Sequence, residues 1–152
     1  MPSHSESRIL PYRADFIYAI VADVERYPEF VPWCAGLRIL AREPAAWGEV
    51  LWAETLVGYK ALRERYTSRV ELEPHVRIDV TQTDGPFRRL ENHWRFGRLG
   101  NRCRIDFSIV FEFRSRLLGR VAGAALGLVM SQMTHAFEAR ARALSHASTR
   151  SG

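Results

Sequence analysis

The chain opens with a strand pattern that changes to a helical one. Residues 5–10 alternate between polar and apolar side chains and are followed by Pro11, which ends the predicted strand. From residue 14 to 24 the apolar side chains recur every three or four positions, which predicts an amphipathic helix. A shorter helical turn is expected over 26–31, where Pro28 and Pro32 limit its length.

After these helices the apolar positions recur with a period of two, as in strands with one buried face. Such segments are predicted at 37–39, 50–57, 62–72, 76–80 and 90–96. The clearest alternation joins Cys103, Ile105, Phe107, Ile109, Phe111 and Phe113. In the segment 76–80, Val76, Ile78 and Val80 should face inward. Turn residues at 84–86 and 100–101 separate consecutive strands, which predicts an antiparallel sheet.

The helical period returns from about residue 116 to 144. Its apolar stripe consists of Leu118, Val121, Ala125, Leu128, Met133, Phe137, Ala141 and Leu144. A helix of about 28 residues is about 42 Å long, which is enough to cover a sheet. The sequence therefore predicts one α+β domain over 1–152, with a core at 5–144. In this domain a curved antiparallel sheet of six to seven strands wraps around the C-terminal helix, and the small polar residues 145–152 form a frayed tail.

Composition narrows the range of functions. With 47% hydrophobic and 26% charged residues among 152, the chain has the balance of one globular domain. The formal net charge is +5, and arginine supplies nearly all the positive charge because Lys60 is the only lysine. Such a surface suits lipid headgroups or RNA phosphates, or is simply solvated. The most apolar run, 121–130, is too short to cross a bilayer, and no signal peptide is visible. The expected location is cytoplasmic, with peripheral contact at the inner membrane as a further option.

The residue types that carry chemistry form no catalytic pattern. Cys34 and Cys103 are far apart and belong to no Cys/His cluster, so no metal site is predicted. None of the five histidines has a partner at metal-ligand spacing. The chain also lacks a phosphate-binding glycine loop and a nucleophile motif. We therefore expect a protein that is not an enzyme and has no catalytic cofactor.

Two features are candidates for a ligand site on the sheet side. Ser68 and Asn92 share the inward faces of their strands with apolar residues. A buried polar group without a partner costs about 1–3 kcal/mol, so these side chains either bond to each other and to backbone or face a ligand. The aromatic segment 27–34 is a lid packed on the core, the mouth of a pocket, or a tip that touches a membrane.

A third candidate is a glycine stripe in the last helix. Gly119, Gly123 and Gly127 recur at every fourth position, although each glycine costs about 1 kcal/mol of helix stability relative to alanine. The stripe allows close packing on the sheet, contact with a partner helix, or a groove for a chain-like ligand.

Several segments match, in order, the motifs of a known family. These segments are 21–34 (VADVERYPEFVPWC), 56–59, 66–68, 84–87, 90–96, 111–113, and 133–137 with Arg140. As a set they resemble the coenzyme Q-binding START-domain proteins of the polyketide cyclase and lipid-transport superfamily. Bacterial members are often named RatA, a ribosome-association toxin. The resemblance extends from about Ser5 to Leu144.

The resemblance implies a START-like helix-grip fold that binds ubiquinone or a similar polyprenyl lipid without a catalytic step. Such binding would support respiration or quinone synthesis. The residues expected at the ligand are Phe30, Trp33, Cys34, Tyr66, Ser68, Asn92, Trp94, Phe107, Phe111, Gly123, Gly127, Met130 and Phe137. Two alternatives stay open: a ribosome-binding regulator that contacts the 50S subunit and inhibits subunit association, and a polyketide cyclase or aromatase-like enzyme. The oligomeric state is not predicted.

Overall fold

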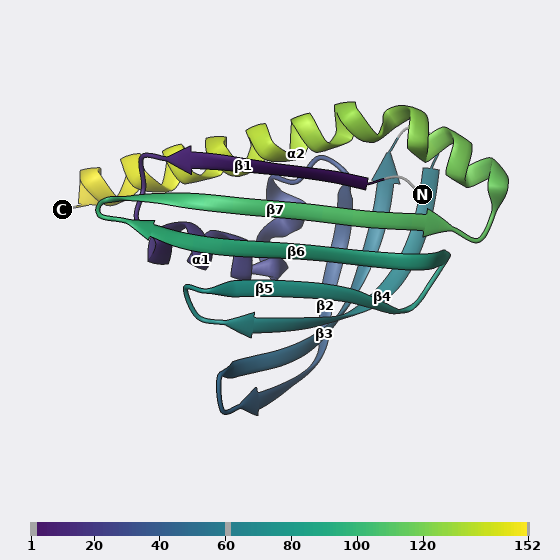
Figure 1. Ribbon diagram of the computed structural model, residues 1–152, viewed down its shortest axis with the longest axis horizontal. Helices are drawn as coiled ribbons and strands as arrows, with labels where there is room; N and C mark the ends of the chain where they lie inside the picture. The colour runs from purple at the N-terminus through teal and green to yellow at the C-terminus, as the bar shows by residue number, and fades with distance from the viewer. Residues whose placement is uncertain (1–2, 60–61, 152) are drawn as a thin grey trace.

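The computed structural model describes residues 3–59 and 62–151, with side chains described for all of these except 59, 62, 121–127, 129 and 147–151. The elements follow in the order β1 (Ser3–Leu10), α1 (Ala14–Ala22), the 3₁₀ helix η1 (Val24–Glu29), β2 (Cys34–Ala45), β3 (Gly48–Tyr59), β4 (Leu62–Glu73), β5 (Arg77–Asp84), β6 (Phe87–Leu99), β7 (Arg102–Phe113) and α2 (Arg116–Ser151). Figure 1 shows α2 running along one side of the curved sheet, next to β1.

The seven strands form one antiparallel sheet in the order β1-β7-β6-β5-β4-β3-β2. Each strand from β2 to β6 pairs with the strand that follows it in the chain, because short turns connect them. The first strand instead pairs with β7, after which the chain continues directly into α2. This topology confirms the predicted helix-grip arrangement of a sheet around a long C-terminal helix.

Bulges help to bend the sheet. The register shifts lie between Cys34 and Gly36, Ile39 and Ala41, Thr67 and Ser68, and Phe87 and Arg89. A bulge bends its strand and increases the local twist. In Figure 1, β2, β3 and β4 accordingly turn away from the plane of β5, β6 and β7 and rise behind them toward α2. The curved sheet and α2 thus enclose a space that their side chains fill only in part.

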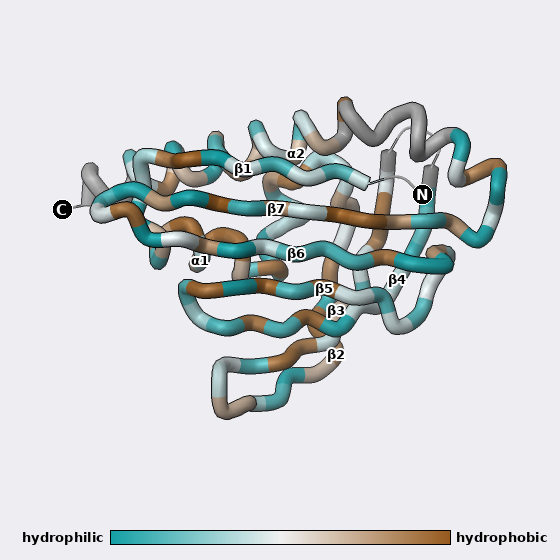
Figure 2. Tube along the Cα trace, in the orientation of Figure 1, coloured by the Kyte–Doolittle hydropathy of each residue, from teal (hydrophilic) through white to brown (hydrophobic). Residues whose placement is uncertain are grey.

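The inward side chains form two hydrophobic clusters. The main core contains the buried face of α1, the middle of the sheet, and Met130, Met133 and Ala141 of α2. A smaller cluster consists of Phe87, Leu90, Phe111 and Phe113, with Leu118 packed against it. Figure 2 shows how hydrophobic and hydrophilic residues alternate along the strands, which leaves the outer face polar.

The outer face of β5 and β6 carries an ion-pair network around Asp79. Its carboxylate accepts hydrogen bonds from Arg77 (2.7 Å) and Arg95 (2.8 Å) and lies 2.6 Å from Nδ1 of His93. Burial acts to raise the pKa of Asp79, but the bonds to these three groups outweigh it, so that the pKa lies below its usual value. The network stabilises the sheet surface and lies on the side opposite to the core.

Several element boundaries differ from the sequence predictions. The first helix ends at Ala22 and passes into the 3₁₀ helix η1, and β2 begins at Cys34 rather than at Leu37. The predicted frayed tail is helical, because α2 continues to Ser151. No proline or glycine interrupts residues 145–150, so nothing in the sequence ends the helix there.

Three residues predicted to face the core are exposed. Val76 is 47% exposed because it belongs to the turn before β5, where His75 has a φ of 66°. Leu128 is 53% exposed, since it lies two positions, or about 200°, around the helix from the buried Met130. Leu144 is 37% exposed. The side chains of Val121 and Ala125 lie outside the described part of the chain.

Within residues 3–59 and 62–151, no helix combines the length and the hydrophobicity that a membrane-spanning segment needs.

Candidate ligand-binding cavity

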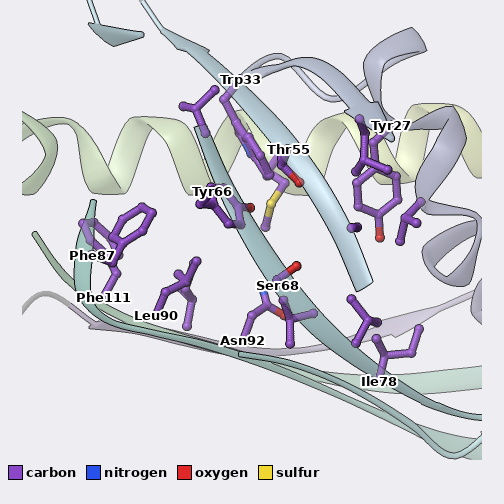
Figure 3. Close-up of a pocket in the computed structure, with 18 of the residues that line it drawn as sticks. Tyr27, Trp33, Thr55, Tyr66, Ser68, Ile78, Phe87, Leu90, Asn92 and Phe111 are labelled. Carbon is purple, nitrogen blue, oxygen red and sulfur yellow. The ribbon is translucent and has the colours of Figure 1, made fainter. Parts of the chain in front are cut away.

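A cavity of about 190 Å³ lies between the concave face of the sheet, η1 and α2. Its walls come from η1 and the segment after it, from β2 to β7, and from α2. Figure 3 shows side chains from these elements pointing toward one another across the space. Eight of the residues predicted at the ligand line this cavity: Trp33, Tyr66, Ser68, Asn92, Trp94, Phe111, Met130 and Phe137.

Three other predicted residues do not line it. Phe30 packs against the wall residue Phe137, with 5.2 Å between the centroids of the two rings. Cys34 is buried beside the cavity, where its thiol donates to the carbonyl oxygen of Gly36 (3.6 Å). Phe107 lines a smaller neighbouring cavity of about 40 Å³. The segment 27–34 therefore contributes to the wall through some residues only.

The glycine stripe is described in part. A Cβ placed on Gly119 would meet no atom within 4 Å, so close backbone packing does not require a glycine at this position. The surroundings of Gly123 and Gly127 lie outside the described residues, and their expected role in ligand binding stays a prediction.

The aromatic segment 27–34 is a lid packed on the core, and its inner side lines the cavity. The hydroxyl of Tyr27 donates to the carbonyl oxygen of Val21, and the ring of Tyr27 meets Phe137 edge-on at 5.5 Å. Gly58 on β3 donates its amide to the carbonyl oxygen of Trp33 (2.9 Å), which fixes the end of the lid to the sheet. The packed lid expected from the sequence is therefore observed, and Tyr27 and Trp33 of this segment also line the cavity (Figure 3).

The polar side chains of the cavity are neutral. Burial raises the pKa of Tyr66 to about 12, although a hydrogen bond to Thr55 on the adjacent strand opposes this shift. Burial also raises the pKa of Tyr27 well above its ordinary value. Beside the cavity, burial raises the pKa of the Cys34 thiol to about 11. All three groups stay protonated near pH 7, so none is poised as a base or a nucleophile.

Two polar atoms of the cavity wall have no hydrogen-bond partner. Among the described residues, buried side-chain N or O atoms without a partner are found at His4, Trp33 and Asn92. The indole Nε1–H of Trp33 is a donor, and Oδ1 of Asn92 is an acceptor. Since nearly all buried polar groups in proteins are bonded, these two atoms are candidates for a hydrogen bond to a ligand.

The remainder of the wall is apolar and aromatic. The described residues that line the cavity include no Asp, Glu, His, Lys or Arg. No group of three or more His, Cys, Asp or Glu within the described ranges is arranged to hold a metal ion. The arrangement suits a largely apolar ligand with a small polar part, held by Trp33, Asn92, Ser68 and the Thr55–Tyr66 pair.

Sequence reasoning missed several wall residues. Thr55 is 3% exposed and faces the cavity from β3, where the same inward parity is shared by Ala53. Leu90, Ile109 and Phe113 also line the space. The period-two pattern assigned Leu90, Ile109 and Phe113 correctly to the inner face. It could not show which inward side chains fill the core and which border a void.

Comparison with known proteins gives three kinds of relative. The model of the family described as polyketide cyclase / dehydrase and lipid transport matches residues 10–138. The ribosome association toxin RatA of Escherichia coli (strain K12) is 34% identical over 143 residues, which cover 93% of this chain and 88% of that protein. The mitochondrial coenzyme Q-binding protein COQ10 homolog B of Xenopus laevis is 37% identical over 143 residues, covering 91% and 57% of the two chains.

A solved structure agrees with both the sequence and the fold. The 18 kDa protein CC1736 of Caulobacter crescentus is 37% identical, with a TM-score of 0.81, and the match covers 96% of this chain and 99% of that one. The similarity thus extends over the lid, the sheet and α2 together.

Proposed function

Since this chain belongs to the polyketide cyclase, dehydrase and lipid transport family, we propose that it binds and delivers an apolar lipid, a polyprenyl quinone such as ubiquinone, in its internal cavity. The observation that carries this proposal is an apolar, aromatic cavity whose wall holds an unpartnered donor and an unpartnered acceptor. The name of the Xenopus relative, a coenzyme Q-binding protein, supports the same ligand class.

The energetics of a prenyl chain suit such a carrier. Each methylene removed from water contributes about 0.8 kcal/mol, so a five-carbon isoprene unit contributes about 3–4 kcal/mol. A polyprenyl quinone therefore needs a protein or a membrane around it. The apolar wall supplies the burial, and a few polar groups suffice to orient the ring. The carrier would act in the cytoplasm with peripheral contact at the inner membrane, in support of respiration or quinone synthesis.

Binding without chemistry is part of the proposal. General acid–base catalysis relies mostly on His, Asp, Glu, Lys, Tyr or Cys with a pKa near the working pH. In the described cavity wall the one such residue type is tyrosine, and burial moves the pKa of Tyr27 and Tyr66 further from neutrality. The family description includes cyclases, and a cyclase in this fold would need acid–base groups that this wall does not offer.

The substitution Ala53→Leu tests the cavity directly. Ala53 is 2% exposed and borders the cavity, so three added carbons would occupy ligand space. We expect quinone affinity to fall at least about tenfold, because overlap with the ligand costs more than 1.4 kcal/mol. The melting temperature should change little, since the side chain enters a void. Calorimetric titration with a one-isoprene ubiquinone and mass spectrometry of organic extracts would measure binding.

Ala41→Leu is the matched control, because Ala41 is exposed on β2. It should bind like the unchanged protein. Failure of the unchanged protein to bind any quinone or extractable lipid would contradict the proposed function. Ala53→Leu binding as tightly as Ala41→Leu would show that the ligand lies elsewhere.

A second candidate function is regulation of ribosomes, favoured by the name of the Escherichia coli relative and by the arginine-rich charge of this chain. Arg63, Arg65 and Arg69 lie on the outer face of β4, and Arg69 pairs with Glu71 (3.2 Å). An RNA-binding face should weaken steeply with salt, because each neutralised phosphate releases counterions.

For this candidate we expect that charge reversal of the three arginines reduces co-sedimentation with the 50S subunit. The logarithm of the association constant decreases with the logarithm of the salt concentration, and the magnitude of this slope should become smaller by about 2–3. This corresponds to about 0.7–0.9 for each lost phosphate contact. The thermal stability of the variant, measured in parallel, is the control for folding. Co-sedimentation that survives the charge reversal would remove this face of β4 from the interaction.

A further inference from the structure

The first half of α2 exposes leucines on the side that faces away from the core. Leu117 is 72% exposed and Leu128 is 53% exposed. Eleven positions separate them, so they lie about 20° apart around the helix and about 16 Å apart along it. The buried Met130 lies about 220° around the helix from Leu117. The two leucines therefore share one outward face of α2, while the side chains at 121–127 lie outside the described part of the chain.

The same part of the helix carries positive charge without any carboxylate. Residues 113–137 contain Arg114, Arg116 and Arg120 but no Asp or Glu. All three arginines are exposed. Arg116 and Arg120 lie about 100° and about 60° around the helix from Leu117, on the same side of it. Exposed leucines and exposed arginines thus occupy neighbouring parts of one helix surface.

This surface differs from the outer face of the sheet. There, carboxylates commonly neutralise the arginines, as Asp79 does for Arg77 (2.7 Å) and Asp106 for Arg104 (3.1 Å). A helix face with apolar side chains and uncompensated arginines complements an anionic bilayer, in which negative headgroups lie above acyl chains. RNA would bind the arginines but would leave the leucines in water. The combination therefore favours a lipid surface.

The leucine and arginine face lies beside one end of the cavity. Leu118 packs against the smaller hydrophobic cluster, and all four residues of that cluster line the cavity. The amide of Arg114 donates to the carbonyl oxygen of Pro86 (2.9 Å), and Nε of Arg114 donates to the carbonyl oxygen of Phe87 (3.2 Å). These bonds fix the start of α2 to the strand that forms this end of the cavity. A membrane on this face would therefore lie next to the ligand site.

The size of the cavity also favours a protein that works at a bilayer. An engineered protein cavity of about 150 Å³ holds one benzene molecule. The cavity between the sheet and α2 has about 190 Å³, so it suits a ring with the first part of its tail. The other prenyl units of a longer tail need a further apolar environment, which an adjacent bilayer supplies.

We propose that the first half of α2 docks the protein on an anionic lipid membrane. Leu117 and Leu128 would enter the acyl region, and Arg116 and Arg120 would contact the headgroups. The inference extends the proposed function, because it names the surface at which the carrier takes up and releases its lipid.

Flotation of the protein with quinone-free vesicles tests the docking directly. Vesicles of equal parts phosphatidylcholine and phosphatidylglycerol should bind the protein at least about tenfold more tightly than pure phosphatidylcholine vesicles. Arg116→Gln with Arg120→Gln should weaken binding to the anionic vesicles about 25-fold, because each arginine near such a surface contributes about a factor of five. Leu117→Gln with Leu128→Gln should weaken it at least about tenfold, since less apolar surface enters the membrane.

Matched control variants lie at the other end of the molecule. Figure 1 shows the start of α2 and the turn between β6 and β7 at opposite ends. Near that turn Ile9 is 58% exposed and Leu99 is 43% exposed, and Arg98 and Arg102 are exposed as well. Ile9→Gln with Leu99→Gln, and Arg98→Gln with Arg102→Gln, should float nearly like the unchanged protein. All four double variants should keep their melting temperature, because the replaced side chains are exposed.

The results distinguish docking from ligand binding. If the unchanged protein does not float with anionic vesicles, or if only the control variants lose flotation, the docking face is wrong and the quinone carrier stands. If the arginine variant of α2 floats normally but loses co-sedimentation with the 50S subunit, the face binds RNA and the inference is also wrong. In the α2 variants, calorimetric titration with a one-isoprene ubiquinone should be unchanged, whereas transfer of this quinone between vesicles should be slower. Normal flotation of a protein that binds no quinone would contradict the proposed function and support the docking face.

Discussion

Replacing Leu51 by aspartate should unfold the protein at pH 7 and 25 °C. Leu51 is fully buried on β3, opposite Val70 of β4, in the main hydrophobic core. An unpaired carboxylate in such a place costs several kcal/mol, and the lost leucine packing adds to that cost. Domains of this kind have a total stability of about 5–15 kcal/mol. Near-ultraviolet circular dichroism should show no fixed tertiary structure in the variant.

The variant Ile109→Asp tests the difference between the core and the cavity wall. Ile109 also points inward, from β7, but it is only partly buried and borders the cavity. Ile109→Asp should therefore stay folded with a lowered melting temperature, because water in the cavity can solvate the charge in part. Leu51→Met should cost less than about 1.5 kcal/mol. A folded Leu51→Asp variant beside an unfolded Ile109→Asp variant would contradict this description of the core and the cavity.

The strands were predictable where alternation is unbroken. In β7 every second residue from Cys103 to Phe113 is apolar, and the sequence assigns their inward direction correctly. In β2 the pattern is weak beyond Leu37 and Ile39, and the strand includes Pro44 near its end. Because β2 is an edge strand, it tolerates a proline that a central strand would not. The sequence therefore located this strand by Leu37 and Ile39 but did not define where it ends.

The faces of the helix were predictable only in part. A stripe of apolar residues defines a helix, but it does not fix which arc contacts the sheet. The buried arc runs through Met130, Met133 and Ala141, so Leu128 lies outside it. Met130 belongs to the predicted ligand residues but not to the predicted stripe. The predicted end of the last helix, at about residue 144, was wrong because small polar residues are compatible with both a helix and a tail.

The site was predictable as a set of residue types rather than as a geometry. Inward parity identified Ser68 and Asn92, and the family motifs identified Trp33. The sequence could not show that the polar atoms of Trp33 and Asn92 lack partners, since that depends on three elements meeting around a void. Phe30 and Cys34 belong to the same lid motif, yet neither lines the cavity. Neighbours in a motif thus do not share one role.

The wall residue Phe137 joins the lid, the sheet and α2. Its ring contacts those of Phe30 (5.2 Å), Trp94 (5.3 Å) and Tyr27 (5.5 Å). It also borders the smaller cavity near β1, where the described wall includes Glu6 and Arg8. Phe137 therefore forms, with Trp94 and Met133, the wall shared by the main cavity and the smaller one.

Phe137→Ala should both destabilise the protein and release its ligand faster. Loss of the ring removes three aromatic contacts and merges the two cavities, so we expect a loss of about 3 kcal/mol, the lower end for buried phenylalanine. In a chain of this size that corresponds to a melting temperature lower by about 6–12 °C. The dissociation rate of a bound quinone, followed by transfer to vesicles, should rise about tenfold, because the merged smaller cavity offers a second exit toward β1.

Two control variants distinguish the role of the cavity wall in retaining the ligand from the role of the lid. Phe137→Leu keeps most of the bulk, so it should restore slow dissociation even though the edge-on contacts are lost. Arg140→Ala removes the ion pair with Glu29 (3.4 Å) on the lid surface and the cation–π contact with Phe30 (5.1 Å), and it should have little effect on release because exposed ion pairs contribute little. Dissociation as fast in Phe137→Leu as in Phe137→Ala would mean that ring packing on the lid, rather than a closed wall, retains the ligand. An unchanged rate in Phe137→Ala would place the exit elsewhere, because the barrier that this ring forms would then not limit release.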